Sequence, residues 1–417
     1  MSVTVTAADV DAAAGRLRGI AEVTPLEPNS RLSRRTGADV WLKREDLQAV
    51  RSYKLRGAFN LIAQLDDDQR AAGVVTASAG NHAQGVAHAC AALGVRGRIY
   101  LPRTTPRQKR DRIAALGGDA IEVILGGDTY DDASAAAAAD AASTGATLVP
   151  AFDDLRTVAG QGTVVREAIE QLGKAPDVVV LPVGGGGLLA GALTWLRENH
   201  PQTRVVGVEP AGAASMMAAL DAGGPVELDD LDTFVDGAAV RRVGDVTYPI
   251  VAASAAELVP VPEGAICSEM LELYQTDGII AEPAGALAEA ALSAGAVELA
   301  PGATVVCVLS GGNNDVSRYA EVVERALVHE GRKHYFLVEF PQEPGALRRF
   351  LDEVLGPDDD ITLFEYVKRS NRETGPALVG IEIASADDLP ALLTRMEEAP
   401  SRIERIDSES PLFRYLL

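Results

Sequence analysis

The sequence predicts an α/β protein in which a large region of alternating strands and helices is followed by a smaller domain of ferredoxin-like plan. From about residue 38 to residue 309, short runs rich in Val, Ile and Leu alternate with segments of helical periodicity. Gly-rich or polar loops follow several of these runs, and the order of the elements changes after about residue 330. Strands that alternate with helices indicate parallel sheets with helices on both faces.

Six apolar runs, each bounded by Gly, Pro or a turn residue, predict buried strands. Between them, helical patterns occupy residues 82–93, 107–116 and 130–143. In parallel sheets, ligands gather where strands end and helices begin, so we expect a binding cleft between two α/β lobes. The predicted strands are residues 74–77, 98–101, 120–125, 178–182, 205–209 and 304–309.

The tail has a different order of elements, strand-helix-strand-strand-helix, with a possible last strand. This order is the ferredoxin-like plan, a small sheet with helices on one face. Residues 318–332 form a helix-like linker, and we place the domain boundary between 1–325 and 326–417. The predicted strands are residues 334–340, 361–368, 377–383 and 402–407, and the predicted helices are residues 344–354 and 387–396.

Composition excludes several classes of protein. The 417 residues carry a net charge of -22, which disfavours binding to nucleic acid or to an anionic membrane. No run approaches the roughly 18 apolar residues of a membrane span, and the N-terminus lacks a signal-peptide pattern. Three scattered cysteines without CxxC spacing argue for a reducing compartment and against a zinc site. We therefore expect a cytoplasmic protein.

Lys54 is a candidate nucleophilic amine. It lies in the segment Ser-Tyr-Lys-Leu-Arg-Gly, and the chain has only six lysines. An imine-forming lysine must react unprotonated, which a desolvated site near another cation favours. Arg56 is the nearest cation along the chain. The alternative is an ordinary solvated lysine on a helix.

A second candidate is the glycine quartet after residue 183. Without Cβ atoms, successive glycines let their N–H groups converge on an anion such as a phosphate. The run lacks the Gly-Lys-Ser/Thr ending of a Walker loop and the spacing of a dinucleotide loop. The alternative is a turn that permits close helix–sheet packing. The segment is Gly184, Gly185, Gly186, Gly187 and Leu188.

Two further loops follow predicted strands. In the first, backbone amides can bind a carboxylate and the Asn81 side chain can reach a ring hydroxyl, although helix capping would also explain its residues. In the second, Ser310 can face a heterocyclic nitrogen, or belong to a simple turn. The first loop contains Ser78, Ala79, Gly80, Asn81 and His82.

Taken in order, these motifs resemble the pyridoxal-phosphate dehydratases of fold type II, and most of all the biosynthetic threonine dehydratase family. The series is Ser-x-Lys-x-Arg-Gly, Ser-x-Gly-Asn-His, the glycine quartet, Glu-Pro-x-Gly and Ser-Gly-Gly-Asn. The resemblance covers about residue 24 to the end of the chain. Residues 341–347 are similar to the opening of that family's ACT-like regulatory domain.

The resemblance implies roles for individual residues. Lys54 would form the internal aldimine with pyridoxal 5'-phosphate and remove the Cα proton of the substrate. Asn81 would contact the 3-hydroxyl of the cofactor, and Ser310 its pyridine nitrogen. Gly184 to Leu188 would hold the phosphate. The substrate carboxylate would bind to Ser78, Ala79, Gly80 and His82.

The implied activity is conversion of L-threonine into 2-oxobutanoate and ammonia through aminocrotonate, the first step of isoleucine biosynthesis, with some activity on L-serine. Leu55 stands where related synthases carry an aspartate, and Ala79 where serine racemases carry a serine. Glu209 matches the racemase metal site, but Ser215 replaces its aspartate, so we expect no tightly bound divalent metal.

For the tail, the resemblance implies a domain that binds isoleucine, which lowers activity, with valine opposing it. A single unit of this kind suits a homotetramer, in which a neighbour completes the ligand site. Three alternatives remain: a tail that only supports assembly, a catabolic serine/threonine dehydratase, and a non-catalytic amino-acid sensor.

Overall fold

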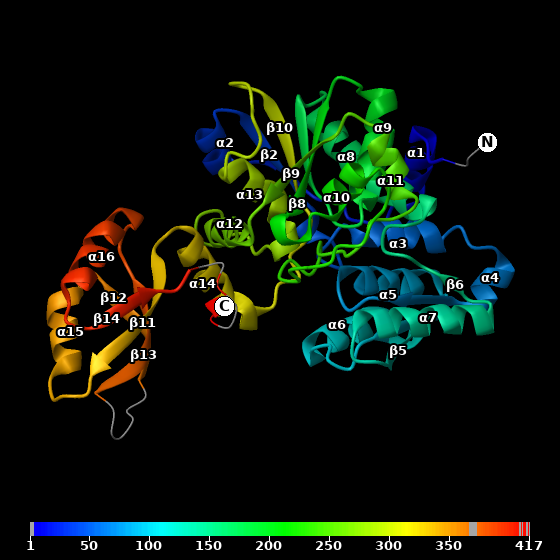
Figure 1. The fold of residues 1–417 in the computed structure, drawn as a ribbon. Coiled ribbons are helices and arrows are strands. Elements are labelled where there is room, and N and C mark those ends of the chain that lie inside the picture. Colours follow the sequence, from blue (N-terminus) through cyan, green and yellow to red (C-terminus); the bar gives the residue numbers. More distant parts are fainter. Residues whose placement is uncertain (1–3, 367–372, 408–409, 411, 414–415, 417) are drawn as a thin grey trace. The chain divides into compact units, whose positions relative to one another are not determined.

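The computed structural model describes residues 4–366, 373–407, 410, 412, 413 and 416 (Figure 1). The chain forms two compact units, Met1–Asn314 and Asp315–Leu417, which are described separately below. This division precedes helix α14 (Tyr319–His329), whereas the boundary expected from the sequence falls inside that helix. The domain boundary between residues 325 and 326 therefore stays a prediction.

The first unit contains a four-stranded parallel sheet in the order β5-β4-β3-β6. Ile99 and Leu101 of this sheet pack against helices α5 (Asn81–Leu93) and α6 (Arg107–Gly117), while Val75 packs against α7 (Tyr130–Thr144) on the other face. Helices thus cover both faces, as predicted. The strands are β3 (Val74–Ala77), β4 (Gly97–Leu101), β5 (Ile121–Leu125) and β6 (Thr147–Leu148).

A second sheet of this unit has six strands in the order β1-β2-β10-β7-β8-β9, all parallel except β1. Side chains of β7 and β10 share one core cluster with helices α8 (Leu155–Leu172) and α9 (Gly187–Asn199). Helix α13 (Leu287–Ser293) also packs on this sheet. The strands are β1 (Leu26–Pro28), β2 (Asp39–Arg44), β7 (Val178–Pro182), β8 (Arg204–Pro210), β9 (Glu257–Val261) and β10 (Thr304–Leu309).

All six strands predicted for this region are confirmed, to within one residue at each end. Four others were not predicted. β6 has only two residues, β1 has three, and β9 contains Pro260, which breaks the strand pattern. β2 buries Lys43, a charge that the apolar pattern of a buried strand excludes.

Helix α3 (Lys54–Ile62) packs closely against α5 and α8 through glycines. A Cβ atom placed on Gly85 of α5 would lie 3.1 Å from the backbone of Lys54, and one on Gly160 of α8 would lie 2.6 Å from the carbonyl oxygen of Arg56. These contacts fix the start of α3 between two helices. Residue 54 is therefore held by backbone packing and not by its own side chain.

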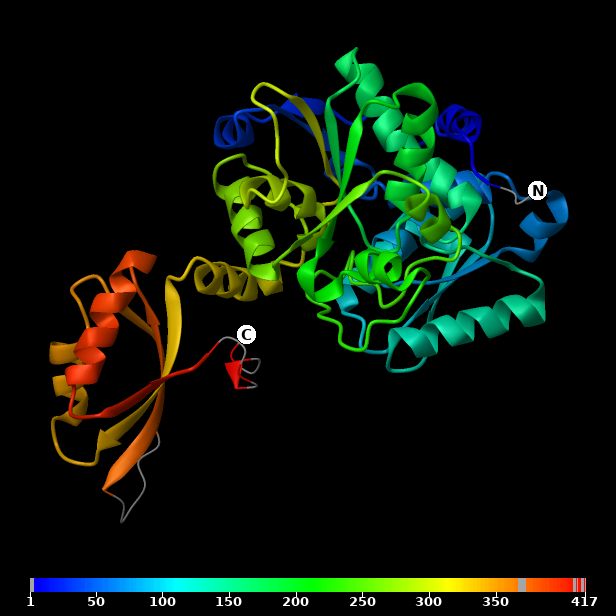
Figure 2. The same cartoon turned by 45° about the horizontal axis from the view of Figure 1, so that its top comes forward.

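The second unit has the ferredoxin-like strand order β12-β13-β11-β14. Figures 1 and 2 show α15 (Ala346–Val354) and α16 (Leu389–Glu398) on the same side of the sheet. The predicted plan is confirmed; residues 367 and 368 of the predicted strand 361–368 lie outside the described residues. The strands are β11 (Lys333–Pro341), β12 (Asp360–Tyr366), β13 (Thr374–Glu382) and β14 (Arg402–Arg405).

None of the helices in the described part of the chain is long and apolar enough to cross a membrane.

Candidate active site

Lys54 opens helix α3 directly after a strained turn. Arg51 has a φ of 57°, the one positive value among the described non-glycine residues, and such a conformation persists only where the surroundings enforce it. The Lys54 Nζ lies 5.2 Å from the centre of the Tyr53 ring. Within the described residues it has no hydrogen-bond partner and no ion-pair partner, so the amine is available for chemistry.

Arg56, two residues further on, is fully engaged. It is buried and donates to both oxygens of Glu45, at 2.7 and 2.9 Å, and to Glu167 at 3.0 Å. Burial alone would raise the pKa of Glu45, but the guanidinium holds it below its ordinary value. Because these carboxylates compensate its charge, Arg56 stabilises the fold. It is not the nearby cation that was expected to activate Lys54.

Lys43 belongs to the same buried network. Its Nζ donates to Glu167, Gln171 and the carbonyl oxygen of Thr24, at 2.5, 2.8 and 2.7 Å. All three donors of the ammonium are thereby used. Of the two lysines in this region, Lys54 alone offers a free amine.

The Lys54 segment is hydrogen-bonded to the loop of Ser310. Ser52 and Gly311 form an isolated antiparallel bridge, and the Tyr53 amide donates to the Ser310 carbonyl oxygen at 3.2 Å. The Ser310 side chain is buried, and its Oγ donates to the carbonyl oxygen of Ala284 at 3.1 Å. Two of the predicted site residues, Lys54 and Ser310, thus lie on segments that are joined by backbone hydrogen bonds.

Asn81 joins this group through side-chain hydrogen bonds. Its Oδ1 accepts from Nδ2 of Asn313 at 2.7 Å, and its Nδ2 donates to Oε1 of Glu282 at 2.5 Å. Asn313 also donates to the carbonyl oxygen of Val50, just ahead of the lysine segment. Asn81, the segment directly before Lys54 and the loop of Ser310 are therefore connected by hydrogen bonds.

His82 is buried, and its Nε2 lies 2.8 Å from the carbonyl oxygen of Val149. A carbonyl only accepts, so Nε2 carries the proton, which leaves Nδ1 as an acceptor without a partner among the described residues. Burial lowers the pKa of His82 to about 4, although the Val149 carbonyl opposes this, and the Lys54 charge lowers it further. The imidazole is neutral at physiological pH.

Residues 78–80 form the half-buried loop that leads into α5, and the Ser78 Oγ accepts the Gly80 amide at 3.3 Å. Helix α5 begins at Asn81, without a side-chain cap on its first turn. Uncapped amides at a helix start suit a carboxylate. The role of Ser78, Ala79, Gly80 and His82 in binding substrate stays a prediction.

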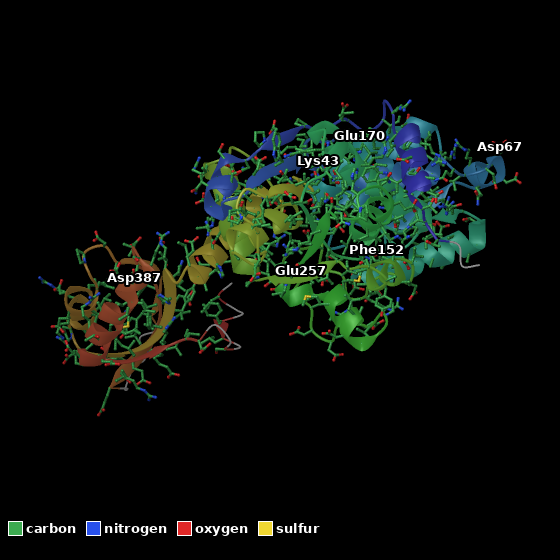
Figure 3. The ribbon with its side chains drawn as sticks, turned by 90° about the horizontal axis from the view of Figure 1, so that it is seen from above. Lys43, Asp67, Phe152, Glu170, Glu257 and Asp387 are labelled. Atoms are coloured by element: carbon green, nitrogen blue, oxygen red, sulfur yellow. The ribbon has the colours of Figure 1, made fainter. Side chains whose placement is uncertain are left out.

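The glycine quartet lies between β7 and α9 and requires glycine for steric reasons. Gly186 has a φ of 88°, and a Cβ atom on Gly185 would lie 2.3 Å from the ring of Phe152, which Figure 3 labels. One on Gly184 would lie 2.9 Å from the Ala238 carbonyl oxygen. The loop is therefore enclosed by other segments, and it opens helix α9 at Gly187.

These residues fit pyridoxal phosphate. The cofactor needs an amine, a cradle of amides for its phosphate and polar groups at its ring. Lys54, the glycine quartet, Asn81 and Ser310 offer these, and the buried hydroxyl of Ser52, two residues before the amine, has no partner among the described residues.

Glu209 is occupied within the protein. Its carboxylate accepts the amides of Met216 and Met217 at 2.7 and 2.9 Å, at the start of α10 (Ser215–Ala222). Burial raises its pKa to about 7, although these two hydrogen bonds oppose the rise. The described residues contain no cluster of three or more His, Cys, Asp or Glu side chains that could hold a metal ion.

Four residues of this region were not predicted as site residues. Glu282 and Asn313 lie inside recognised motifs, but their link to Asn81 spans 201 and 232 positions of the chain. Phe152 packs on Gly185, and the Thr247 hydroxyl donates to the Gly185 carbonyl oxygen at 2.6 Å. No local sequence pattern predicts the contacts of Phe152 and Thr247 with Gly185.

Comparisons with known proteins agree with this geometry. The family described as pyridoxal-phosphate dependent enzyme matches residues 17–311, and the C-terminal regulatory domain of threonine dehydratase matches residues 324–416. The chain is 63% identical to L-threonine dehydratase biosynthetic IlvA of Mycobacterium tuberculosis over 415 residues, which are 99% of this chain and 96% of that protein. It is 57% identical to the protein of the same name from Corynebacterium glutamicum, over 99% of this chain and 95% of that protein.

Two solved structures are similar as well. Threonine deaminase isoform 2 from Solanum lycopersicum, in its processed form, matches with a TM-score of 0.72 and 40% identity, over 76% of this chain and 92% of that chain. Maize serine racemase matches with a TM-score of 0.72 and 28% identity, over 78% and 99%. The extent and identity of these matches show that the chain belongs to the pyridoxal-phosphate-dependent biosynthetic threonine dehydratases, with their C-terminal regulatory domain.

Proposed function

We propose that this protein is an L-threonine ammonia-lyase, which converts threonine into 2-oxobutanoate and ammonia at the start of isoleucine biosynthesis. The observation that carries the proposal is the Lys54 amine, which has no hydrogen-bond partner among the described residues. It follows a segment whose backbone is hydrogen-bonded to Ser310 and, through Asn313, to Asn81. A non-catalytic sensor would not need an unpaired amine there. Family membership and the names of the relatives support the same activity.

Each residue has a proposed task. Pyridoxal phosphate supplies an aldehyde for attachment to Lys54 and a ring that withdraws electrons from the substrate Cα. The amides of Gly184 to Leu188 hold the phosphate, Asn81 contacts the ring hydroxyl, and the Ser310 hydroxyl faces the ring nitrogen. For this last contact, the Ser310 hydroxyl would have to rotate and give up its hydrogen bond to the carbonyl oxygen of Ala284.

The reaction needs one base and one binding loop. Ser78, Ala79, Gly80 and His82 bind the substrate carboxylate, which orients the Cα–H bond towards the Lys54 amine. Lys54 takes that proton and passes it on to the β-hydroxyl, so that one proton and one hydroxyl leave the substrate together as water. Free aminocrotonate then takes up water and yields 2-oxobutanoate and ammonia, so no net water is consumed.

The direct test is Lys54→Ala. The purified variant is expected to lose the visible absorbance of the bound cofactor and the formation of 2-oxobutanoate from threonine. Circular dichroism serves as the control for folding. Turnover at the wild-type rate would refute the assignment.

L-Serine is a second, poorer substrate. It lacks one methyl group, and a difference of one carbon in an apolar pocket gives at most about 200-fold discrimination. We expect serine to be deaminated with a kcat/KM between one and two orders of magnitude below that for threonine. A preference for serine would instead favour the catabolic serine/threonine dehydratase.

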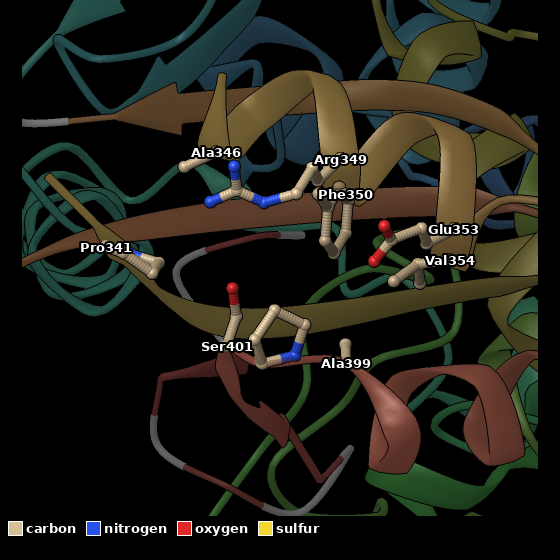
Figure 4. A pocket seen from close by; sticks show the side chains of 9 residues that line it. Pro341, Ala346, Arg349, Phe350, Glu353, Val354, Ala399 and Ser401 are labelled. Atoms are coloured by element: carbon tan, nitrogen blue, oxygen red, sulfur yellow. The ribbon is translucent and has the colours of Figure 1, made fainter. Parts of the chain in front are cut away.

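The second unit is the place for effectors. A shallow pocket with a cavity volume of about 10 Å³, open to solvent, lies between helix α15 and residues 399–401 (Figure 4). Arg349, which would have to release its ion-pair partner Glu343, and Glu353 offer opposite charges for the carboxylate and ammonium of an amino acid. The apolar Phe350 and Val354 lie beside them. We assign isoleucine, as inhibitor, and valine, as its antagonist, to this pocket.

Arg349→Ala tests the assignment, with Arg348→Ala as matched control. Arg348 is the preceding residue of α15, and its side chain is 87% exposed and ion-paired with Asp352. Threonine kinetics across an isoleucine series are expected to shift at least tenfold in the Arg349 variant alone. A wild-type curve unaffected by isoleucine would leave the domain with a purely assembling role.

The proposal extends to assembly and location. A single ferredoxin-like unit needs a neighbour to complete a ligand site, so we propose a homotetramer in the cytoplasm. Light scattering at several concentrations, with and without isoleucine, tests the tetramer.

A further inference from the structure

Glu282 is a buried carboxyl group to which neither the sequence nor the proposed reaction gives a task. It is 5% exposed and lies directly before the short helix Pro283–Gly285. Its backbone amide donates to the Gly311 carbonyl oxygen at 3.1 Å. A Cβ atom on Gly311 would lie 1.9 Å from its Oε1, so the carboxyl group lies against the residue that follows Ser310.

The carboxyl group fixes the orientation of the Asn81 amide. Oδ1 of Asn81 accepts from Asn313, so Nδ2 must be the atom that donates to Glu282 at 2.5 Å. An amide nitrogen has two protons. One is used by Glu282, and the second is left for another acceptor at the site. Without the Glu282 contact, the Asn313 hydrogen bond would be left to hold the amide in this orientation.

Charged groups surround Glu282 from several elements. Burial raises its pKa to about 7, and the negative charge of Asp236 adds to the rise. The Asn81 hydrogen bond, Lys109 on α6 and Lys54 on α3 oppose it. Lys109 and Asp236 also form an ion pair of 2.8 Å with each other. A proton on Glu282 and a positive charge at Lys54 therefore influence each other.

Resting on the proposed function, we propose that Glu282 is a positioning residue for the cofactor. It holds the Asn81 amide with one N–H directed to the ring oxygen, and its negative charge favours a proton on the nitrogen of Lys54. It touches neither substrate nor reacting atoms, and its effect passes through Asn81 and through space.

The test compares Glu282→Gln with Glu289→Gln in the holoenzyme. Glu289 is a second buried carboxyl group of the same unit, beside the Cys307 thiol. The visible absorbance band of the bound cofactor is titrated with pH, and the cofactor Kd is measured by equilibrium dialysis. Neither readout depends on turnover.

Removal of the Glu282 charge is expected to lower the midpoint of the absorbance titration by about one pH unit, since loss of an opposite charge lowers the pKa of a cationic group by about that much. The cofactor Kd should rise about tenfold. Glu282→Asp, which keeps the charge but is one carbon shorter, should restore the midpoint but not the Kd. Glu289→Gln should match the wild type in both.

Wild-type midpoint and Kd in the Glu282→Gln variant would overturn the inference while leaving the proposed function intact. A Lys54→Ala variant that still turns over threonine would overturn the proposed function itself, so the two failures are distinguishable.

If Glu282→Gln does not fold, an NMR titration of the wild-type apo-protein tests the proposal instead. With ¹⁵N-labelled asparagine, the side-chain amide signal of Asn81, identified by its loss in Asn81→Ser, should shift with a midpoint near pH 7. An unchanged signal from about pH 5.5 to about pH 8.5, the range that brackets this midpoint, would overturn the proposal.

Discussion

Lys54 and Arg56 lie two residues apart on the same helix, and the protein treats them in opposite ways. Arg56 is buried and donates to two carboxylates, whereas the Lys54 amine has no hydrogen-bond partner among the described residues. A buried charge that serves the fold must be paired, because an unpaired one costs several kcal/mol. An amine that serves chemistry must stay free. The pairing of a cation therefore separates its structural role from its catalytic one.

The sharpest way to break this comparison is to remove each cation in turn. Lys54→Met should lower threonine turnover by more than about 1,000-fold, the range of a lost general base. The unfolding free energy of the apo-protein should change by less than about 0.5 kcal/mol. Measurement without cofactor avoids the stabilisation that ligand binding adds.

Arg56→Met should show the reverse pattern. The variant leaves Glu45 buried without its partner, which should cost about 3–5 kcal/mol of unfolding free energy. Urea unfolding of the apo-protein measures the loss. Equal losses of stability in the Lys54 and Arg56 variants would contradict the division of roles.

The glycine loop gives a smaller effect. In Gly185→Ala the new methyl group would meet the Phe152 ring at 2.3 Å, and overpacking of this kind costs about 1–3 kcal/mol. Cofactor affinity should fall at the same time, because the loop must shift. Gly224→Ala is the control, since nothing lies within 4 Å of a Cβ atom there. A wild-type cofactor Kd in the Gly185 variant would contradict the assignment of this loop to phosphate binding.

Glu289 offers a test that depends on pH. Burial raises its pKa to about 8, so the folded protein binds this proton more tightly than the unfolded chain, in which the pKa is near 4.5. Its contribution to the unfolding free energy is therefore largest below about pH 4.5 and is lost as the pH rises to about 8. Glu289→Gln should raise Tm by a few degrees at about pH 8.5, with little change at about pH 5. A Tm difference independent of pH would contradict this account.

Tyr53 should have the smallest effect. Its ring lies near the Lys54 amine, at 5.2 Å from the ring centre to Nζ. Tyr53→Phe keeps the ring and removes only a half-buried hydroxyl, so kcat/KM should change less than about threefold, or below about 0.7 kcal/mol. A larger loss would give the hydroxyl a part in the reaction.

Sequence reasoning succeeded where the signal is local. Strands β7 and β10 are buried on both faces and appear as continuous apolar runs. Asn81 and the glycine quartet belong to short motifs at strand ends, and Lys54 belongs to a short motif at the start of α3. The order and spacing of these motifs along the chain revealed the family. The ferredoxin-like plan of the second unit also follows from the local patterns.

It failed where distant partners decide. Strand β2 buries Lys43 because Glu167, 124 positions away, neutralises it. Arg56 was expected to influence Lys54, but it pairs with Glu45 and Glu167 instead. No local pattern reveals that Glu282 accepts a hydrogen bond from Asn81, or that Phe152 covers Gly185. These contacts arise from the tertiary fold alone.

The backbone bridge between Ser52 and Gly311 has a consequence for biosynthesis of the chain. The side-chain amide of Asn313 bonds to the carbonyl oxygen of Val50, 263 positions earlier, and contacts at such separations form only after both partners have left the ribosome. A nascent chain that ends before residue 310 has the lysine but not the segment 310–313, which is hydrogen-bonded to residues 50–53. The enzyme therefore acquires its reactive centre late, once nearly all of the first unit has been translated.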